Sequence, residues 1–364
     1  MKTVKSLSLI IISICLLCVA SIGHARHAAM LVDASNGNVL YQSEPTQAWY
    51  PASLTKLMTL YMAFDALNSG KIQLQDSIVT SRHAALQPKS KLYLRTGEII
   101  TVEQAIIALV TRSANDAAVA LAEHIGGTED SFAAKMTAKA HAIGMLDTHF
   151  MNATGLPHAW QVSTARDLAL LAWHTLYDFP DYYPYFSAHS LSFRGGELPA
   201  INKFTEHYPG AEGMKTGFTC GSGYNLISTA SQNGHRLIGV VLGGMSSSQR
   251  YQLMMDMMDA GFAGQYTPNG QHIENPVVSS NSTPPQQLGC GKATVTTASS
   301  DTDDDNYDNI PHRAKHQYVV TKTKFHPKGQ VGKRGKVIHV SKTKATAKSK
   351  TVAKVSKKSN KKRG

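Results

Sequence analysis

Two β-hairpin patterns lie near the two ends of the first 275 residues, and a long helical stretch separates them. In the first, Ala28 to Tyr41, apolar runs flank Asn36-Gly37; in the second, Asn233-Gly234 joins Tyr224–Ser231 to Arg236–Gly243. Asn-Gly favours a type I′ turn, in which both central residues need a positive φ. Apolar periodicity between the hairpins predicts four helices, Leu54–Leu67, Val102–Leu109, Asn115–Ile125 and Thr128–Ile143, the last ended by Gly144. Strands this distant in the chain can pair if the helices pack on one sheet, which predicts a single α+β domain.

The net charge of +12 is distributed unevenly along the 364 residues. Residues 26–275 carry 16 Lys+Arg and 20 Asp+Glu, whereas residues 312–364 carry 18 Lys+Arg and no acidic residue. Residues 276–311 are rich in Ser, Thr, Pro, Asn and Asp. We therefore predict a folded domain over 26–275, a disordered linker over 276–311 and a disordered basic tail over 312–364.

The N-terminus has the pattern of a secretory signal peptide over residues 1–25. Lys2 and Lys5 precede an apolar run, Leu7 to Ala20, and Gly23-His-Ala25 offers small residues for cleavage. The alternative, an uncleaved membrane anchor, is disfavoured because the run is shorter than the ~20 residues that a spanning helix needs. This predicts secretion across the inner membrane, with the mature chain in the periplasm or cell envelope.

Three short motifs stand in one order along the predicted domain: Ser53-Leu-Thr-Lys56, Ser113-Ala-Asn115 and Lys215-Thr-Gly217. Each spelling is weak by itself, since Ser341-Lys-Thr-Lys344 also fits the first and Ser231-Gln-Asn233 the second. Their context is more specific, because the first two open apolar helices and the third lies beside a hairpin. Together they specify a serine acyl-transfer site of the penicillin-binding kind.

The spacing of Ser53 and Lys56 suits nucleophilic catalysis. Residues three apart at the start of a helix lie on one face, so the amine can reach the hydroxyl. A desolvated lysine crowded by another cation, for which Lys215 is a candidate, can be neutral and take the serine proton. Backbone N–H groups at the helix start favour the oxyanion that forms when the serine attacks a carbonyl. The alternative is that Ser53 only caps the helix and that Lys56 is a solvated charge.

Longer segments around these motifs resemble the D-alanyl-D-alanine carboxypeptidases, the low-molecular-mass penicillin-binding proteins of serine peptidase family S11. The resemblance covers nearly all of residues 28–245. It rests on Pro51-Ala-Ser-Leu-Thr-Lys-Leu-Met-Thr59, Ser113-Ala-Asn-Asp-Ala-Ala118, Asn152-Ala-Thr-Gly-Leu156, Ser163-Thr-Ala-Arg-Asp-Leu168 and Gly213-Met-Lys-Thr-Gly-Phe-Thr219. It implies the penicilloyl-serine transferase fold, a five-stranded antiparallel sheet flanked by helices, with the site between the sheet and the helical part.

The resemblance also implies a role for each motif residue. Ser53 is the expected nucleophile and Lys56 the base that activates it, while Ser113 relays protons to the departing amine. Among the substrate-binding groups, Asn115 holds the substrate backbone, Lys215 supplies positive potential, Thr216 bonds the substrate carboxylate and Gly217 lets the substrate approach the strand. The backbone N–H groups of Ser53 and Phe218 form the expected oxyanion hole.

A basic residue that binds the terminal carboxylate is expected before the third motif. Lys203 stands roughly where the family places an arginine, and an ordinary surface lysine is the equal alternative. Lysine is a point charge whereas arginine is a bidentate fork, so this difference bears on carboxylate affinity.

Two further residue types limit the chemistry. The chain has no His-Glu-x-x-His and no Cys-x-x-Cys, and its 16 histidines are scattered, so we expect neither a metal site nor a cofactor. Cys220 is predicted to be an unpaired structural thiol, with a bridge to Cys290 and a modifiable thiol near the site as the alternatives.

The leading functional hypothesis is removal of the terminal D-alanine from peptidoglycan stem pentapeptides during cell-wall biogenesis. Cleavage of D-alanyl cross-links by the same residues, and a non-catalytic wall-binding protein, are the alternatives. β-Lactam antibiotics are the expected covalent inhibitors. The basic tail is a candidate for binding anionic envelope polymers, with a solvated extension as the alternative, and no nucleic acid partner is expected.

Overall fold

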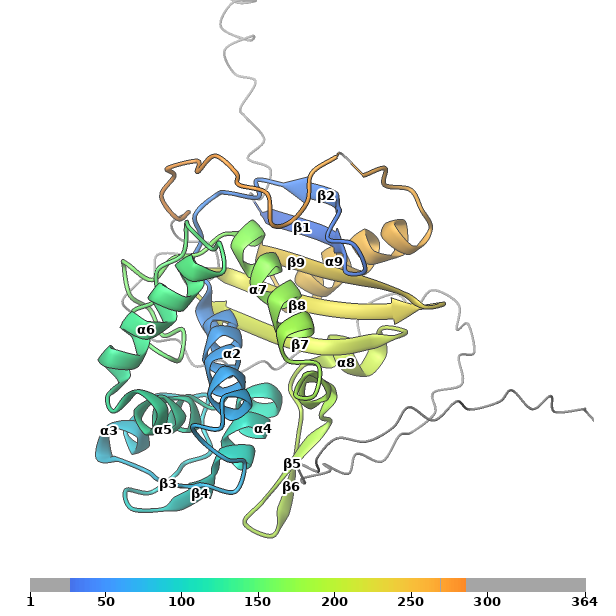
Figure 1. Ribbon diagram of the computed structural model, residues 1–364. Helices are drawn as coiled ribbons and strands as arrows, with labels where there is room; N and C mark the ends of the chain where they lie inside the picture. The colour runs from blue at the N-terminus through green and yellow to red at the C-terminus, as the bar shows by residue number, and fades with distance from the viewer. Residues whose placement is uncertain (1–26, 269, 286–364) are drawn as a thin grey trace, which may run out of the picture. The chain divides into compact units, whose positions relative to one another are not determined.

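The computed structural model describes residues 27–268 and 270–285, and its central element is a five-stranded antiparallel sheet (Figure 1). The strand order is β2-β1-β9-β8-β7, so the first two strands pair with the last three. The bounds are β1 Ala28–Asp33, β2 Val39–Ser43, β7 Ala211–Thr219, β8 Gly223–Gln232 and β9 His235–Gly244. The predicted pairing of strands from the two ends of the domain is confirmed by the register of β1 with β9, in which Met30 faces Val240.

The two predicted hairpins form, but their turns differ. Asn233 and Gly234 both have positive φ, 52° and 81°, so β8 and β9 are joined by the expected two-residue turn. At the first hairpin only Gly37 has a positive φ, and the connection spans Ala34 to Asn38. The type I′ prediction is wrong there because Asp33 organises a longer turn: its carboxylate accepts bonds from the Ser35 N–H and the Asn36 side chain.

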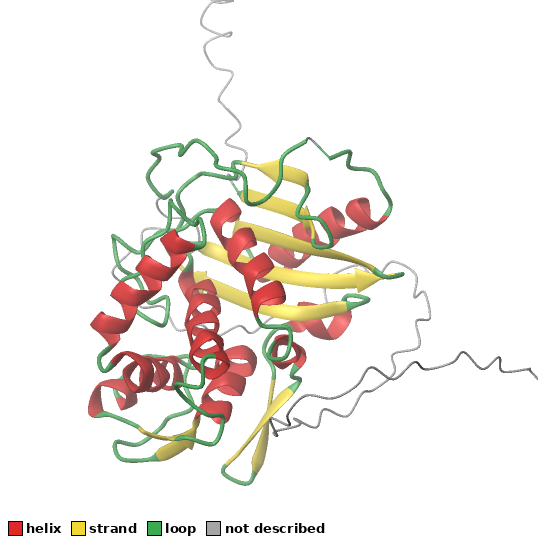
Figure 2. Cartoon of the chain, in the orientation of Figure 1, coloured by secondary structure: helices red, strands yellow, loops and turns green. Residues whose placement is uncertain are grey.

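Both faces of the sheet are covered by helices (Figures 1 and 2). Alternate residues of β9 enter two separate cores: Ile238 and Val240 contribute to one, Leu237 and Val241 to the other. The first core lies against α2 Thr55–Asn68 and α7 Ala165–Asp178, and the second against α8 Lys203–His207 and α9 Ser247–Phe262. Burial on both faces explains why β9 reads as a continuous apolar run.

The helical part beside the sheet contains the predicted helices. Its main elements are α4 Val102–Arg112, α5 Asn115–Gly126 and α6 Glu129–Ala142, with the short α3 Arg82–Ala85. Thr101 and Thr128 cap α4 and α6 by accepting bonds from Gln104 N–H and Ser131 N–H. Gly144 follows α6 with φ 89°, as predicted for its cap.

Two small hairpins complete the described chain: β3 Ser77–Val79 with β4 Ile99–Thr101, and β5 Ser190–Phe193 with β6 Gly196–Pro199. The single turns η1 Ala52–Leu54 and η2 Tyr183–Ser187 precede α2 and β5. No helix among residues 27–268 and 270–285 is long and apolar enough to cross a membrane.

The chain after α9 returns to the N-terminal part of the domain. Within the segment predicted as linker, Ser280 bonds the Thr46 carbonyl, Ser282 accepts the Ala48 N–H and the Thr283 carbonyl accepts the Gln47 side chain. The predicted signal peptide and basic tail, and the linker beyond Pro285, lie outside the described residues.

Candidate active site

Ser53 is held in η1, immediately before α2, by the sheet beneath it. The side chain of Asn225 on β8 donates to the carbonyls of Tyr50 and Pro51, at 3.1 and 3.3 Å, and accepts the Gly243 N–H at 2.9 Å. Ala52 has φ 48°, a conformation that is uncommon for a residue with a Cβ. Ser53 is 5% exposed and makes no side-chain cap, so the structure contradicts the capping alternative.

Lys56 is completely buried, and its amine contacts Ser53. Its Nζ lies 3.0 Å from Ser53 Oγ, 2.7 Å from Asn115 Oδ1 and 2.7 Å from the Thr154 carbonyl oxygen. Asn115 Nδ2 donates to the Pro88 carbonyl at 3.0 Å, which fixes the amide so that its oxygen faces Lys56. The alternative of a solvated lysine is therefore wrong.

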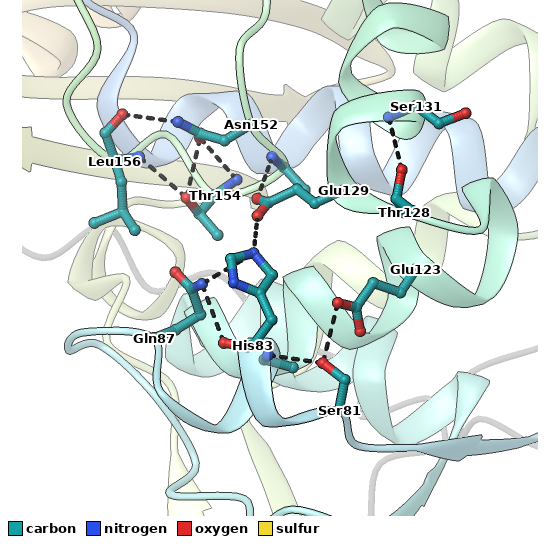
Figure 3. Close-up of polar contacts among 12 residues, drawn as sticks. Ser81, His83, Gln87, Glu123, Thr128, Glu129, Ser131, Asn152, Thr154 and Leu156 are labelled. Carbon is teal, nitrogen blue, oxygen red and sulfur yellow. Dashed lines mark hydrogen bonds and ion pairs between the residues drawn. The ribbon is translucent and has the colours of Figure 1, made fainter.

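The loop that carries Thr154 is pinned from two sides (Figure 3). Glu129, in the first turn of α6, accepts the Ala153 N–H through Oε1 at 3.0 Å and contacts His83 Nε2 through Oε2 at 2.7 Å. The Thr59 hydroxyl donates to the Ala153 carbonyl at 2.7 Å. Asn152 Oδ1 accepts the Thr154 and Gly155 N–H groups. The peptide that presents its carbonyl to Lys56 is thus fixed in place.

Gly155 is required by close packing between this loop and η1. It has φ 87°, and a Cβ there would lie 1.9 Å from the Ala52 carbonyl oxygen. Any larger residue would push the Thr154 carbonyl away from Lys56.

Ser113 lies between α4 and α5 with φ 52°, in the left-handed region. Its Oγ is buried and has no hydrogen-bond partner among the described residues. The loop between α3 and β4 is anchored to α5 by buried Asp116, whose carboxylate accepts the N–H groups of Leu92 and Leu94 at 3.0 Å each. Asn115 adds an N–H bond to the Ser90 carbonyl at 2.7 Å.

The third motif lies on β7, the edge strand of the sheet. A Cβ on Gly217 would lie 3.0 Å from the Ser53 nitrogen, so the strand runs directly against η1. Lys215 is 1% exposed and donates to the Thr216 carbonyl at 2.8 Å. Phe218 follows on the same strand, with its ring centroid 4.2 Å from that of Tyr224 and the two rings tilted by 31°.

The structure therefore brings Ser53, Lys56 and Asn115 into direct contact and places Gly217 against Ser53. Lys203 is separate from this cluster: it lies on α8, and its Nζ pairs with Glu206 at 3.1 Å. Thr154, Glu129 and Asn225 were not predicted as site residues. Thr154 lies in Asn152–Leu156, one of the segments that carry the family resemblance. Nothing local in the sequence marks Glu129 or Asn225.

Cys220 is disulfide-bonded, which contradicts the predicted unpaired thiol. The other cysteines of the chain, Cys15, Cys18 and Cys290, lie outside the described residues. Within the described part of the chain, no group of three or more His, Cys, Asp or Glu side chains is arranged to hold a metal ion.

Comparison with known proteins places this arrangement in a family. The model of Peptidase_S11, D-alanyl-D-alanine carboxypeptidase, matches residues 19–246. The chain belongs to the S11 family. D-alanyl-D-alanine carboxypeptidase DacF of Bacillus subtilis is 33% identical over 264 residues, which cover 71% of this chain and 67% of DacF. The chain spans about three fifths of the length of three other curated carboxypeptidases that it matches.

Solved structures of S11 relatives share the fold. Penicillin binding protein 5 from Haemophilus influenzae has a TM-score of 0.63 at 34% identity, covering 65% of this chain and 70% of that one. Penicillin-Binding Protein D2 from Listeria monocytogenes, solved in its ampicillin-bound form, has a TM-score of 0.60 at 30% identity, covering 65% and 97%. The predicted penicilloyl-serine transferase fold is confirmed.

Proposed function

We propose that the protein is a serine D-Ala-D-Ala carboxypeptidase that removes the terminal D-alanine from peptidoglycan stem pentapeptides. The observation that carries this proposal is the contact of Lys56 Nζ with Ser53 Oγ at 3.0 Å, inside a buried site of an S11 family member.

Three contacts of Lys56 support its role as the base. The Asn115 Oδ1 and Thr154 carbonyl oxygens can only accept hydrogen bonds. A neutral amine has two N–H bonds and one lone pair, so donation to these two oxygens leaves a lone pair that can accept the hydrogen of the Ser53 hydroxyl, 3.0 Å away.

The reaction follows from that geometry. Lys56 takes the Ser53 proton as Oγ bonds the carbonyl carbon of the penultimate D-alanine, and the Ser53 and Phe218 N–H groups stabilise the oxyanion. The C–N bond then breaks, and the departing amine receives the proton through Ser113, whose buried hydroxyl has no partner among the described residues. Water then attacks the acyl carbon while Lys56 takes its proton. The bond from this carbon to Ser53 Oγ breaks as Lys56 returns the proton to Oγ, which releases the shortened peptide.

Substrate is expected to bind along the β7 edge. An extended peptide can add to an exposed strand edge by main-chain hydrogen bonds. Gly217 leaves this edge open beside Ser53, Thr216 bonds the substrate carboxylate, and Lys215 supplies positive potential. The second hydrogen on Asn115 Nδ2 is available for the substrate backbone, because the Pro88 carbonyl uses only one.

We extend the proposal to inhibitors and location. The ampicillin-bound form of the Listeria relative supports β-lactams as covalent inhibitors that acylate Ser53. The N-terminal signal pattern supports action in the periplasm or cell envelope. The basic tail is proposed to bind anionic envelope polymers.

The decisive experiment compares wild type with Ser53→Ala. Wild type should release D-alanine from pentapeptide and bind a fluorescent penicillin covalently, whereas Ser53→Ala should do neither while keeping its thermal unfolding midpoint. Cross-linked muropeptide in a parallel reaction distinguishes endopeptidase activity, which would yield monomers. Persistent covalent labelling of Ser53→Ala would overturn the assignment of the nucleophile.

A further inference from the structure

A cavity of about 170 Å³ lies away from Ser53, between α8, the start of β7 and the β5–β6 hairpin. None of Ser53, Lys56, Ser113 and Asn115 lines it. Its apolar wall includes Val110 of α4 and Met214 of β7. In Figure 1, α8 lies beside β7 and the β5–β6 hairpin extends away from it.

Two polar side chains of this cavity have buried atoms with no hydrogen-bond partner among the described residues. Asn202 is 7% exposed, yet neither its Nδ2 nor its Oδ1 makes a hydrogen bond, and the buried Thr205 hydroxyl also lacks a partner. Asn202 precedes α8, where asparagine normally caps the helix, but its side chain makes no capping bond. Buried polar groups are nearly always paired, so these three atoms require hydrogen-bonding partners that residues 27–268 and 270–285 do not provide.

The polar wall of the cavity carries both signs of charge. Lys203 and Glu206 line it and pair with each other at 3.1 Å, with side chains 35% and 54% exposed. An ion pair this exposed is weak and can exchange its partners for those of a ligand. The cavity therefore presents a cation, an anion, an amide that both donates and accepts, a hydroxyl and an apolar wall.

We propose that this cavity binds a small α-amino acid in its zwitterionic form. The ligand carboxylate bonds Lys203, Asn202 Nδ2 and the Thr205 hydroxyl. Its ammonium bonds Glu206 and Asn202 Oδ1, and a short side chain contacts Val110 and Met214. D-alanine is the probe of choice because it is the product of the proposed reaction. That choice rests on the proposed function, whereas the site itself does not. In this arrangement Lys203 binds a carboxylate, but in a site distinct from that of Ser53.

The test is isothermal titration of the full mature chain with D-alanine, L-alanine, glycine, propionate and ethylamine. The amino acids should bind with one site per chain, and the two compounds with a single charge should bind more weakly by at least about tenfold. Protein first acylated with penicillin should bind D-alanine equally well, because the cavity does not include Ser53. Loss of binding on acylation would assign the ligand to the active site and overturn the proposal, as would no binding of any amino acid.

Variants separate this proposal from the proposed function. Thr205→Val and Asn202→Leu should each weaken D-alanine binding by about tenfold or more, while Glu197→Gln, an exposed change on β6 outside the cavity, should not. Penicillin acylation of Thr205→Val should stay at the wild-type rate, which reports its fold and its active site together. A Thr205→Val protein that acylates normally and binds D-alanine as wild type does would contradict the site. Failure of acylation in every protein, with binding intact, would count against the proposed function alone.

Discussion

At the scale of single residues, Lys56 owes its position to amide oxygens from two other segments. Asn115 and Thr154 each accept a hydrogen bond from Nζ, and Ser53 Oγ lies 3.0 Å from the same nitrogen. Replacing Lys56 with alanine removes the proposed base and leaves both amide oxygens without this donor. We predict that acylation by penicillin falls by ~10²–10⁴, the usual value of general-base assistance. Stopped-flow acylation of folded Lys56→Ala at the wild-type rate would be incompatible with this role.

A second prediction concerns Glu129, which acts on Lys56 through the loop between them. Its side chain is 11% exposed and holds the Ala153 N–H, one residue before the carbonyl that contacts Lys56. Glu129→Ala leaves that N–H unpaired, which costs about 1–3 kcal/mol, so we expect acylation to slow by about tenfold. Glu129→Gln should recover most of the rate, because its amide oxygen can still accept the Ala153 N–H.

The control for this positioning role is Glu123→Ala. Glu123 accepts a bond from the Ser81 hydroxyl at 3.0 Å in the same region, without contacting the Asn152–Leu156 loop (Figure 3). Measured acylation rates and apparent affinities for penicillin should show a slower chemical step for Glu129→Ala and no change for Glu123→Ala. A lower unfolding temperature of Glu129→Ala with an unchanged acylation rate would mean that Glu129 is only structural.

At the scale of elements, the sequence predicted those structures whose signals are local. Asn233-Gly234 forms the expected turn because the two strands end on either side of it. At Asn36-Gly37 the Asp33 carboxylate bonds the Asn36 side chain and favours a longer connection. The four predicted helices have regular apolar faces. The β5–β6 hairpin was not predicted, because its strands are only four residues long and give too short a pattern.

The residues of the active site also fall into two groups, those that a local pattern predicts and those that only the fold brings to the site. Ser53 and Lys56 were predictable because their spacing alone brings them together in a helix. Glu129 and Asn225 instead contact residues that are distant in the sequence. Glu129 accepts the Ala153 N–H, and Asn225 donates to the Tyr50 and Pro51 carbonyls. A pattern within one segment contains no information about such contacts, so only the fold reveals them.

The β5–β6 hairpin gives a prediction of pH dependence. Arg194, in its turn, bonds both carboxylate oxygens of Glu98 and the Tyr93 carbonyl. The hydrogen bond from Arg194 is the main cause that lowers the pKa of Glu98. A lowered pKa means that the contact with Arg194 favours the ionised carboxylate of Glu98. The stabilisation from this contact is therefore complete above about 4.3, the pKa of a glutamate without the contact, and is lost as the pH falls through the lower pKa that Glu98 has in the contact.

We therefore expect amide exchange of residues 190–199 to accelerate, relative to β8 and β9 as internal references, as the pH falls below about 4. Glu98→Gln should show fast relative exchange in this hairpin already at neutral pH, and no further step on acidification. Hydrogen exchange with mass spectrometry measures both proteins. Wild-type and Glu98→Gln hairpins that exchange alike at neutral pH would show that this ion pair does not hold the hairpin.

At the scale of the whole molecule, the folded domain continues past the predicted boundary at residue 275. Arg166 donates to the carbonyls of Ile273 and Asn275, and Ser280 and Ser282 bond the segment Thr46–Ala48. A truncation at residue 275 would remove the last of these contacts. The effect of the basic tail is therefore better tested by ending the chain after Pro311, which keeps these contacts and all four cysteines.

We predict that the protein ending at Pro311 hydrolyses small soluble pentapeptides at the wild-type rate but is retained less on wall sacculi. Every proposed catalytic residue lies before residue 219, so the chemistry should not change. Residues 26–275 have an excess of acidic groups, and an anionic polymer repels them, whereas the 18 basic residues of 312–364 attract it. Exposed charges interact over a Debye length of only ~10 Å at 0.1 M salt, so retention of the full-length protein should fall as salt rises. Co-sedimentation of both proteins with sacculi over a salt series measures this, and equal retention at low salt would show that the tail does not bind the wall.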